Sequence, residues 1–231
     1  MTAEQFDLYD AEGVPLGTSK ARDQVHRDGD WHRSVALWIV RARGSLVVQR
    51  RSLAKDTHPG AFTASVSGHY AAGEQLEQVL REAREEIGVA VSARDLVPVR
   101  VWRSDDRPGP GLIDRELMDI FLWPLERDLT EFSPDPGEVM GLAEIEVAGF
   151  QDLLNGSVST LQASWIATGS SSVATIALTA HDFVPMVEYH QHVARAALAY
   201  LSGARPDSSK NVVQGRPVES ITYGDSRADT S

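Results

Sequence analysis

The stretch that decides the fold runs from Gly68 to Val89 and reads GHYAAGEQLEQVLREAREEIGV. Near its end, Glu82, Glu85 and Glu86 have the spacing i, i+3, i+4, which on a helix places them within an arc of roughly 100°. Like charges at this spacing destabilise an isolated helix, so the pattern favours a cation beside them. Carboxylates without histidine or cysteine among them suit Mg²⁺, which also binds substrate phosphates.

The segments around this stretch predict a domain of strands and helices. An apolar stripe of period 3.6 predicts a helix over Gln75–Ile87, ended by Gly88, and a strand at Ala61–Val66 is expected to lead into a loop at Gly68. The other expected elements are a hairpin in residues 6–18, strands at Ser34–Val40, Ser45–Arg50, Leu96–Trp102, Glu116–Trp123 and Leu142–Val147, a turn-rich segment over 104–111, and helices at Ser19–His26, Gly149–Leu154 and Pro185–Leu201. Residues 161–180 favour neither a helix nor a strand. The interleaving predicts one α/β or α+β domain over residues 1–202 with a mixed sheet, and the polar residues 203–231 are expected to be a disordered tail.

Composition narrows the class of protein. The chain has 231 residues, is 42% hydrophobic, and has neither an apolar run of the ~20 residues that a membrane helix needs nor a signal-like N-terminus, so we expect a cytoplasmic protein with no membrane partner. It contains no cysteine, which excludes disulfides, thiolate metal sites and a cysteine nucleophile. Its net charge of −11 argues against binding to polymeric nucleic acid, whereas a small phosphorylated ligand bound through Mg²⁺ remains compatible.

The quoted stretch resembles the Nudix box, in which Gly68, Glu74, Arg81, Glu82, Glu85, Glu86 and Gly88 match the family pattern. The resemblance implies a Nudix-type α/β/α sandwich with a mixed β-sheet. It also implies that Glu82, Glu85 and Glu86, with the carbonyl of Gly68, hold Mg²⁺, for which Mn²⁺ can substitute, and that Arg81 orients the glutamates. Only six residues separate Glu74 from Arg81, one fewer than in the family pattern, which leaves the usual supporting role of Glu74 open.

The flanking segments resemble type I isopentenyl diphosphate isomerases, a branch of the Nudix fold, and hydrolases related to them. The matching pieces include DLYDAEGVPLGT, VHRDGDWH, QRRSLAKDTHPGAFTASVSGHY, DRELMDIF, GEVM and DFVP. The resemblance implies a second divalent-metal site formed by His26, His32, His69, Asp114 and Glu116, and diphosphate contacts by Lys20, Arg51 and Lys55. The alternative is that each histidine is simply exposed or hydrogen-bonded.

Two substitutions distinguish this chain from the isomerases. Ser67 stands where they have a catalytic cysteine, and a hydroxyl is a far poorer acid and nucleophile than a thiol. Glu82 stands where they carry an arginine that contacts the diphosphate, and a carboxylate there would repel a diphosphate unless Mg²⁺ intervened.

These differences favour Mg²⁺-dependent hydrolysis of a nucleoside diphosphate or a related diphosphate-linked small molecule. Glu85, Glu86 and Glu138 are the catalytic candidates, with Glu85 or Glu138 accepting the proton of the attacking water. Glu138 is equally compatible with a role as a further metal ligand or as an ordinary loop residue. An isomerase-like enzyme and a noncatalytic nucleotide-binding module remain as alternatives.

Overall fold

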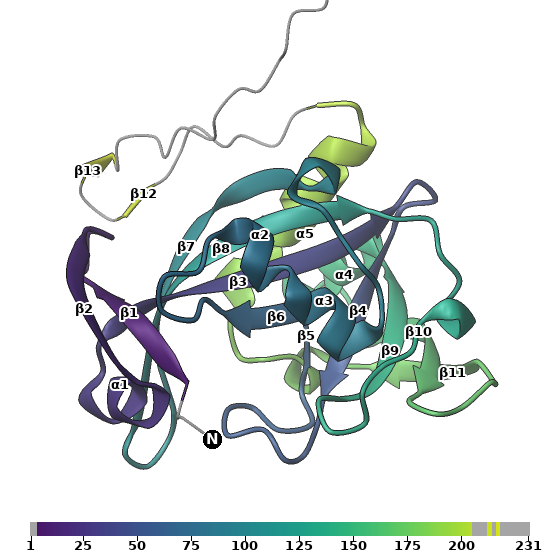
Figure 1. The fold of residues 1–231 in the computed structure, drawn as a ribbon. Coiled ribbons are helices and arrows are strands. Elements are labelled where there is room, and N and C mark those ends of the chain that lie inside the picture. The colour runs from purple at the N-terminus through teal and green to yellow at the C-terminus, as the bar shows by residue number, and fades with distance from the viewer. Residues whose placement is uncertain (1–3, 205–211, 214–215, 218–231) are drawn as a thin grey trace, which may run out of the picture.

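The computed structural model describes residues 4–204, 212–213 and 216–217. Residues 4–204 form a mixed sheet with helices on both faces (Figure 1). Most of the expected tail, residues 203–231, lies outside the described residues. The exceptions are residues 203–204 and the two-residue strands β12 (Val212–Val213) and β13 (Arg216–Pro217). No helix in the described part of the chain is long and apolar enough to cross a membrane.

The N-terminal segment forms the expected hairpin and then a helix. Strands β1 (Gln5–Tyr9) and β2 (Pro15–Ala21) pair antiparallel, and α1 (Arg22–Asp28) follows directly. The predicted start of this helix at Ser19 was wrong, because Ser19 pairs with Asp7 in the hairpin. Gly29 ends α1 in the left-handed conformation (φ 71°), and this turn leads the chain into the central strand.

The long strand β3 (Trp31–Arg41) organises the sheet. The order of strands along the main path of the sheet is β11-β10-β9-β4-β3-β1-β2. The strands not yet given bounds are β4 (Ser45–Arg51), β9 (Val139–Glu146), β10 (Leu161–Ala167) and β11 (Ala174–Leu178). Off this path, β5 (Phe62–Thr63) pairs with β4, β6 (Val66–His69) pairs antiparallel with β3, and β8 (Leu112–Pro124) pairs parallel with β3 and antiparallel with β7 (Val97–Gly109). The one parallel pairing among the described strands, β3 with β8, makes the sheet mixed.

Three sequence expectations about strands need correction. Gly68 lies inside β6 rather than in a loop after a strand, because the expected strand at 61–66 is divided into β5 and β6. Most of the segment 104–111 is strand, since β7 continues to Gly109 and absorbs its irregular residues in a register shift between Asp106 and Gly109. The ambiguous stretch 161–180 contains the antiparallel pair β10 and β11.

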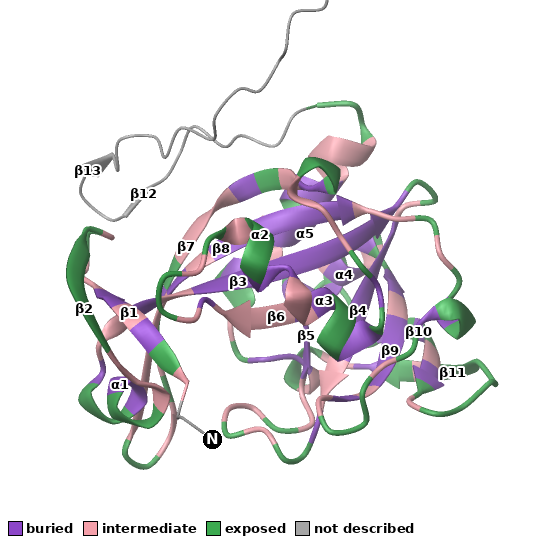
Figure 2. Ribbon diagram, viewed as in Figure 1, coloured by how far each residue is buried: buried purple, intermediate pink, exposed green. Residues whose placement is uncertain are grey.

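Helices cover both faces of the sheet, as expected for an α/β/α sandwich. In Figure 1, α2 (Leu76–Val79) and α3 (Arg81–Ile87) lie in front of the sheet, and α4 (Val147–Leu154) and α5 (Val187–Leu201) lie behind it. Two large clusters of buried hydrophobic residues lie one on each face, so the central strands β3 and β4 are buried along most of their length (Figure 2). A third, small cluster packs β1 against α1. Strands buried on both faces read as continuous apolar runs, which is why their sequences lack alternation.

The predicted single helix over Gln75–Ile87 was wrong. It is interrupted at Leu80 (φ −64°, ψ −7°), and Ala83 N–H donates to Leu80 O at 3.3 Å in the tighter pattern of a 3₁₀ turn. The interruption falls between Glu74 and Arg81, where the box is one residue short. After this interruption a new helix, α3, begins at Arg81, and its glutamates share one face.

One hydrogen bond in the core connects the sheet to α5. Trp38 Nε1–H donates to Tyr189 OH at 2.9 Å, and both side chains are buried. A buried indole requires such a partner, and here the partner is at the start of α5. The contact therefore fixes where the N-terminal end of α5 crosses the sheet.

Candidate active site

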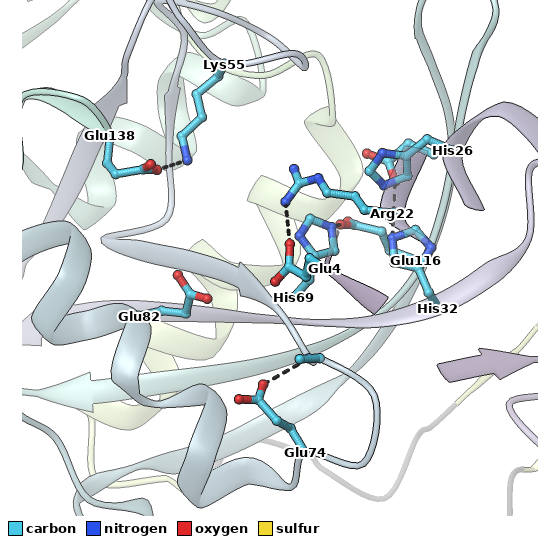
Figure 3. A network of polar contacts seen from close by, with 12 residues as sticks. Glu4, Arg22, His26, His32, Lys55, His69, Glu74, Glu82, Glu116 and Glu138 are labelled. Carbon is cyan, nitrogen blue, oxygen red and sulfur yellow. Dashed lines mark hydrogen bonds and ion pairs between the residues drawn. The ribbon is translucent and has the colours of Figure 1, made fainter. Parts of the chain in front are cut away.

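Three histidines and one aspartate meet at one end of the sheet. His26 from α1, His32 from β3, His69 from β6 and Asp114 from β8 each place one ligand atom within 4.8 Å of the others. Nε2 of His26 and Nε2 of His32 lie 3.7 and 3.6 Å from Asp114 Oδ1. Figure 3 shows the three imidazole rings gathered in one place.

The buried atoms His26 Nε2, His32 Nε2, His69 Nε2 and Asp114 Oδ1 form no hydrogen bond of good geometry among the described residues, although Glu116 Oε1 lies 3.0 Å from His69 Nε2. Such burial is costly unless another group satisfies the atoms. His32 Nδ1–H donates to the Asp30 carbonyl at 3.1 Å, which leaves the lone pair of Nε2 directed at the cluster. Three imidazole nitrogens and a carboxylate oxygen therefore fit a divalent transition metal.

Glu116 adjoins this cluster without being one of its four converging members. Its Oε1 lies 3.0 Å from His69 Nε2. Burial raises the pKa of Asp114 to about 8, with the charge of Glu116 adding to the effect, and burial raises the pKa of Glu116 to about 7. Burial also lowers the pKa of His32 and His69 well below the usual range. Neutral imidazoles are the form that binds a metal, and metal binding would release protons from the carboxyls.

A second group of side chains, the glutamates Glu82, Glu85 and Glu86, lies on α3. Glu82 of this group packs against Gly68. Glu86 is 2% exposed, and its Oε2 accepts hydrogen bonds from Ser67 N–H at 2.9 Å and from Gln49 Nε2–H at 3.0 Å. These donors fix one carboxylate oxygen. Burial raises the pKa of both Glu82 and Glu86 to about 7, opposed by Arg81 for Glu82 and by the Ser67 amide for Glu86. A cation beside them would restore the ionised form.

Arg81 connects the glutamates of the box. Its Nη1 donates to both oxygens of Glu74 at 3.0 and 2.9 Å, and its Nη2 lies 3.1 Å from Glu82 Oε1. Glu74 also accepts a hydrogen bond from Ala71 N–H at 2.9 Å, so it supports both the loop and Arg81 although the box is one residue short. Glu85 is more exposed and lies 3.8 Å from Arg81 Nε.

One cleft of about 600 Å³ is lined both by the glutamates of α3 and by His69, Asp114 and Glu116 at the histidine cluster. Ten of its lining residues are aspartate or glutamate, whereas four are lysine or arginine. A diphosphate would be repelled by this excess of carboxylates unless cations balanced it. The charge of the cleft therefore fits divalent metal ions bound before or with an anionic ligand.

Two of the predicted basic residues line this cleft. Arg51 donates from Nε and Nη2 to Thr57 O and Thr57 Oγ1, both at 2.9 Å. Lys55 forms an ion pair with Glu138, which comes from the segment before β9 and also lines the cleft (Figure 3). The cleft thus brings Arg51, Lys55 and Glu138 together with the glutamates of α3.

Lys20 does not share this position. Its Nζ lies 3.0 Å from Asp28 Oδ2 and 2.6 Å from Asp30 Oδ2, and Lys20 is not among the residues that line the cleft. The two aspartates at the end of α1 hold the ammonium group away from it.

Arg22 lines the cleft instead, and sequence reasoning missed it. It is the first residue of α1, and its Nη1 lies 3.2 Å from Glu4 Oε2 (Figure 3). Its spacing of i, i+4 from His26 puts both side chains on one helix face, and this signal was available in the sequence.

Comparisons with known proteins agree with this architecture. The sequence matches the NUDIX domain family over residues 30–167. An uncharacterised Nudix hydrolase of Clostridium acetobutylicum is 29% identical over 205 residues, which cover 86% of this chain and 98% of that protein. An isopentenyl-diphosphate Delta-isomerase of Escherichia coli is 33% identical, and the match covers 69% of this chain and 85% of the isomerase.

Among solved structures, the protein DR0079 of Deinococcus radiodurans superposes with a TM-score of 0.51 at 22% identity, covering 66% of this chain and 90% of that one, which supports the fold. The match to the family covers more than half of the chain, and the fold is the expected sandwich. The chain belongs to the Nudix domain family, in the branch that resembles isopentenyl-diphosphate isomerases.

Proposed function

We propose that this chain is a divalent-metal-dependent hydrolase that cleaves a diphosphate bond in a nucleoside diphosphate or a related diphosphate-linked small molecule. The observation that carries the proposal is the shared cleft, which is lined by the glutamates of α3, by His69 and Asp114 of the histidine cluster, and by the basic side chains of Arg22, Arg51 and Lys55. The acidic excess calls for metal ions, and the basic residues provide contacts for phosphate.

The residues available for Mg²⁺, or Mn²⁺ in its place, are Glu82, Glu85 and Glu86 with the carbonyl of Gly68. Bound there, the metal would neutralise charge on the diphosphate oxygens and lower the pKa of the attacking water from 15.7 toward ~7. The His26, His32, His69 and Asp114 cluster fits a second divalent metal, with nitrogen ligands that favour a transition metal over Mg²⁺.

The protein's own groups perform the remaining work. Arg51, Lys55 and Arg22 contact the phosphate oxygens, and Arg81 positions Glu82 through the ion pair described above. Glu85 or Glu138 accepts the proton of the attacking water. Because Glu138 forms an ion pair with Lys55, binding of the diphosphate to Lys55 would free the Glu138 carboxylate for this role.

A second candidate function is isomerisation of an isoprenoid diphosphate, favoured by the histidine cluster and by the isomerase relatives. Ser67 argues against it, because protonation of an alkene carbon needs a stronger acid than a hydroxyl. Glu82 argues against it as well, since its carboxylate faces the cleft.

The test is a screen for phosphate release and product identity with purified protein and Mg²⁺. The panel contains nucleoside di- and triphosphates, nucleotide sugars, coenzyme A, thiamine diphosphate and isopentenyl diphosphate. We expect hydrolysis of at least one compound, its loss in Glu86→Gln, and its retention in Glu77→Gln, which changes an exposed glutamate on α2.

Conversion of isopentenyl to dimethylallyl diphosphate without hydrolysis would establish the second candidate. Binding of a panel compound with no turnover would instead indicate a noncatalytic module.

A further inference from the structure

One polar pair in the cleft has no part in the reaction proposed above. His58 belongs to the loop between β4 and β5, and its Nε2 lies 2.7 Å from Asp106 Oδ2 on β7. Both residues line the cleft, with side chains 19% and 32% exposed. The pair therefore presents an imidazole ring to whatever the cleft binds.

The backbone of His58 is held in an unfavourable conformation. Its φ is 47°, and the other residues with positive φ in the described part of the chain are glycines. The left-handed conformation is unfavourable for a residue other than glycine and marks places where the surrounding structure imposes it. Here the two hydrogen bonds from Arg51 to Thr57 fix the residue before His58, and Ala61 N–H donates to His58 O at 3.3 Å.

Asp106 is fixed as well, and its position places the ring beside the histidine cluster. Asp106 pairs in register with Asp114, one of the four converging ligands. Its Oδ1 accepts a hydrogen bond from Arg107 N–H at 2.8 Å, so both of its oxygens are engaged. His58 Nε2 is thus held by a carboxylate that has little freedom to move.

The other ring nitrogen remains available. Nδ1 of His58 makes no hydrogen bond within residues 4–204, and the two nitrogens of an imidazole point in different directions, so Nδ1 faces away from Asp106. In contrast, Lys55 and Arg22 are paired with Glu138 and Glu4, and Arg51 holds Thr57.

We propose that His58 is a substrate-binding residue that donates a hydrogen bond from Nδ1 to a phosphoryl oxygen in the cleft. The proposal rests on the proposed function only in that a diphosphate occupies this cleft. In this arrangement Asp106 accepts a hydrogen bond from Nε2 on one side of the ring, and a phosphoryl oxygen accepts one from Nδ1 on the other. The strained backbone conformation serves to present this donor.

The competing explanation is that His58 only ties its loop to β7 through Asp106. Three variants separate the two roles. His58→Asn places an amide donor near the position of Nδ1 and tolerates positive φ, whereas His58→Gln can reach Asp106 but offers no donor at the Nδ1 position. His58→Gly keeps the backbone conformation and removes both contacts.

The experiment measures the affinity for imidodiphosphate, a diphosphate that resists hydrolysis, by calorimetry in the presence of Mg²⁺. We expect His58→Gly and His58→Gln to bind it roughly 10-fold more weakly or worse, the size expected for a hydrogen bond to a charged group, and His58→Asn to stay within about 3-fold of wild type. His181→Asn, at an exposed histidine outside the cleft, should bind as wild type does. Thermal unfolding of each variant confirms that it is folded.

Wild-type affinity in His58→Gln with a loss in His58→Asn would overturn the proposal in favour of the loop tie. Unchanged affinity in His58→Gly, or no binding of the probe by the wild type, would overturn it too. Binding is measured apart from turnover, so a wild type that binds through His58 and hydrolyses nothing refutes the proposed function and supports this inference.

Discussion

Gly68 and Glu82 approach so closely that a Cβ added to Gly68 would lie 2.4 Å from Glu82 Cγ and 2.5 Å from Glu82 Cδ. No real Cβ contact is this short, so any other residue at position 68 would displace the Glu82 side chain. The glycine that opens the box therefore makes room for a carboxylate of the cleft.

Gly68→Ala should reduce kcat/KM for the substrate identified by the screen by roughly 10- to 100-fold, the usual cost of disturbing a residue that orients a metal ligand. The change in the free energy of unfolding should be small, because the displaced carboxylate can turn into the cleft. Gly109→Ala is the control, since its Cβ would meet only Leu112 Cδ1, at 3.9 Å. Wild-type kinetics in Gly68→Ala would show that Glu82 has no role in turnover.

Gln49 should control how well the protein binds Mg²⁺. Its buried amide donates to Glu86 Oε2, so Gln49→Leu leaves Glu86 with the Ser67 amide alone. We expect the Mg²⁺ concentration for half-maximal hydrolysis to rise roughly 10- to 100-fold, with much of the rate recovered at high Mg²⁺. Gln162→Leu, at an exposed glutamine on β10, should leave the Mg²⁺ dependence unchanged. If Gln49→Leu and Gln162→Leu need the same Mg²⁺ concentration for half-maximal hydrolysis, Gln49 does not control Mg²⁺ binding.

The histidine cluster should couple metal binding to stability. Added Mn²⁺ or Zn²⁺ should raise the unfolding temperature of chelator-treated protein, by an amount corresponding to about 2.7 kcal/mol when the metal is at 100 times its Kd. In His69→Gln the rise should be much smaller, because one of the converging nitrogens is lost. The exposed His181→Gln serves as the control. If His69→Gln gains as much stability from the metal as wild type does, these histidines are not its ligands.

His190 should make the fold less stable in acid. Burial lowers the pKa of His190 to about 3, whereas an unfolded histidine titrates near 6.5. Below pH 6.5 the unfolded chain therefore binds one more proton than the folded chain. Stability from the neutral ring is complete above pH 6.5 and falls by about 1.4 kcal/mol per pH unit toward pH 3.

His190→Phe tests this pH dependence, since the ring packs among Trp38, Phe150, Phe183 and Tyr189 and a phenyl group suits those neighbours. Urea unfolding at pH 7.5 and pH 5.0 should show the variant gaining about 2 kcal/mol on wild type at the lower pH. An offset between variant and wild type that is the same at both pH values would mean that His190 does not titrate on unfolding.

Sequence patterns correctly predicted the features of the fold that depend on local interactions. The spacing of Glu82, Glu85 and Glu86 fixes their common face because the geometry of a helix turn depends only on neighbouring residues. Apolar runs located β3 and β4 for a similar reason, although the boundaries shifted by a few residues. The break at Leu80 was missed, because the apolar residues on both sides of it, such as Leu76 and Ala83, keep a common period of 3.6.

Tertiary structure decided which distant residues meet. His32 and His69 come together because β3 pairs antiparallel with β6, and Asp114 joins them because β3 also pairs parallel with β8. The cleft position of Arg22, rather than Lys20, follows from where β2 ends and α1 begins.

By itself, then, the sequence determined the family and the mixed sandwich through the resemblance of the box to the Nudix pattern. It determined the acidic face of α3 through helix periodicity, which is a property of a short segment. Only the tertiary structure decided that His58 meets Asp106 and that Gln49 meets Glu86. These contacts depend on strand register and loop closure, which are set by packing across the whole domain rather than by nearby residues.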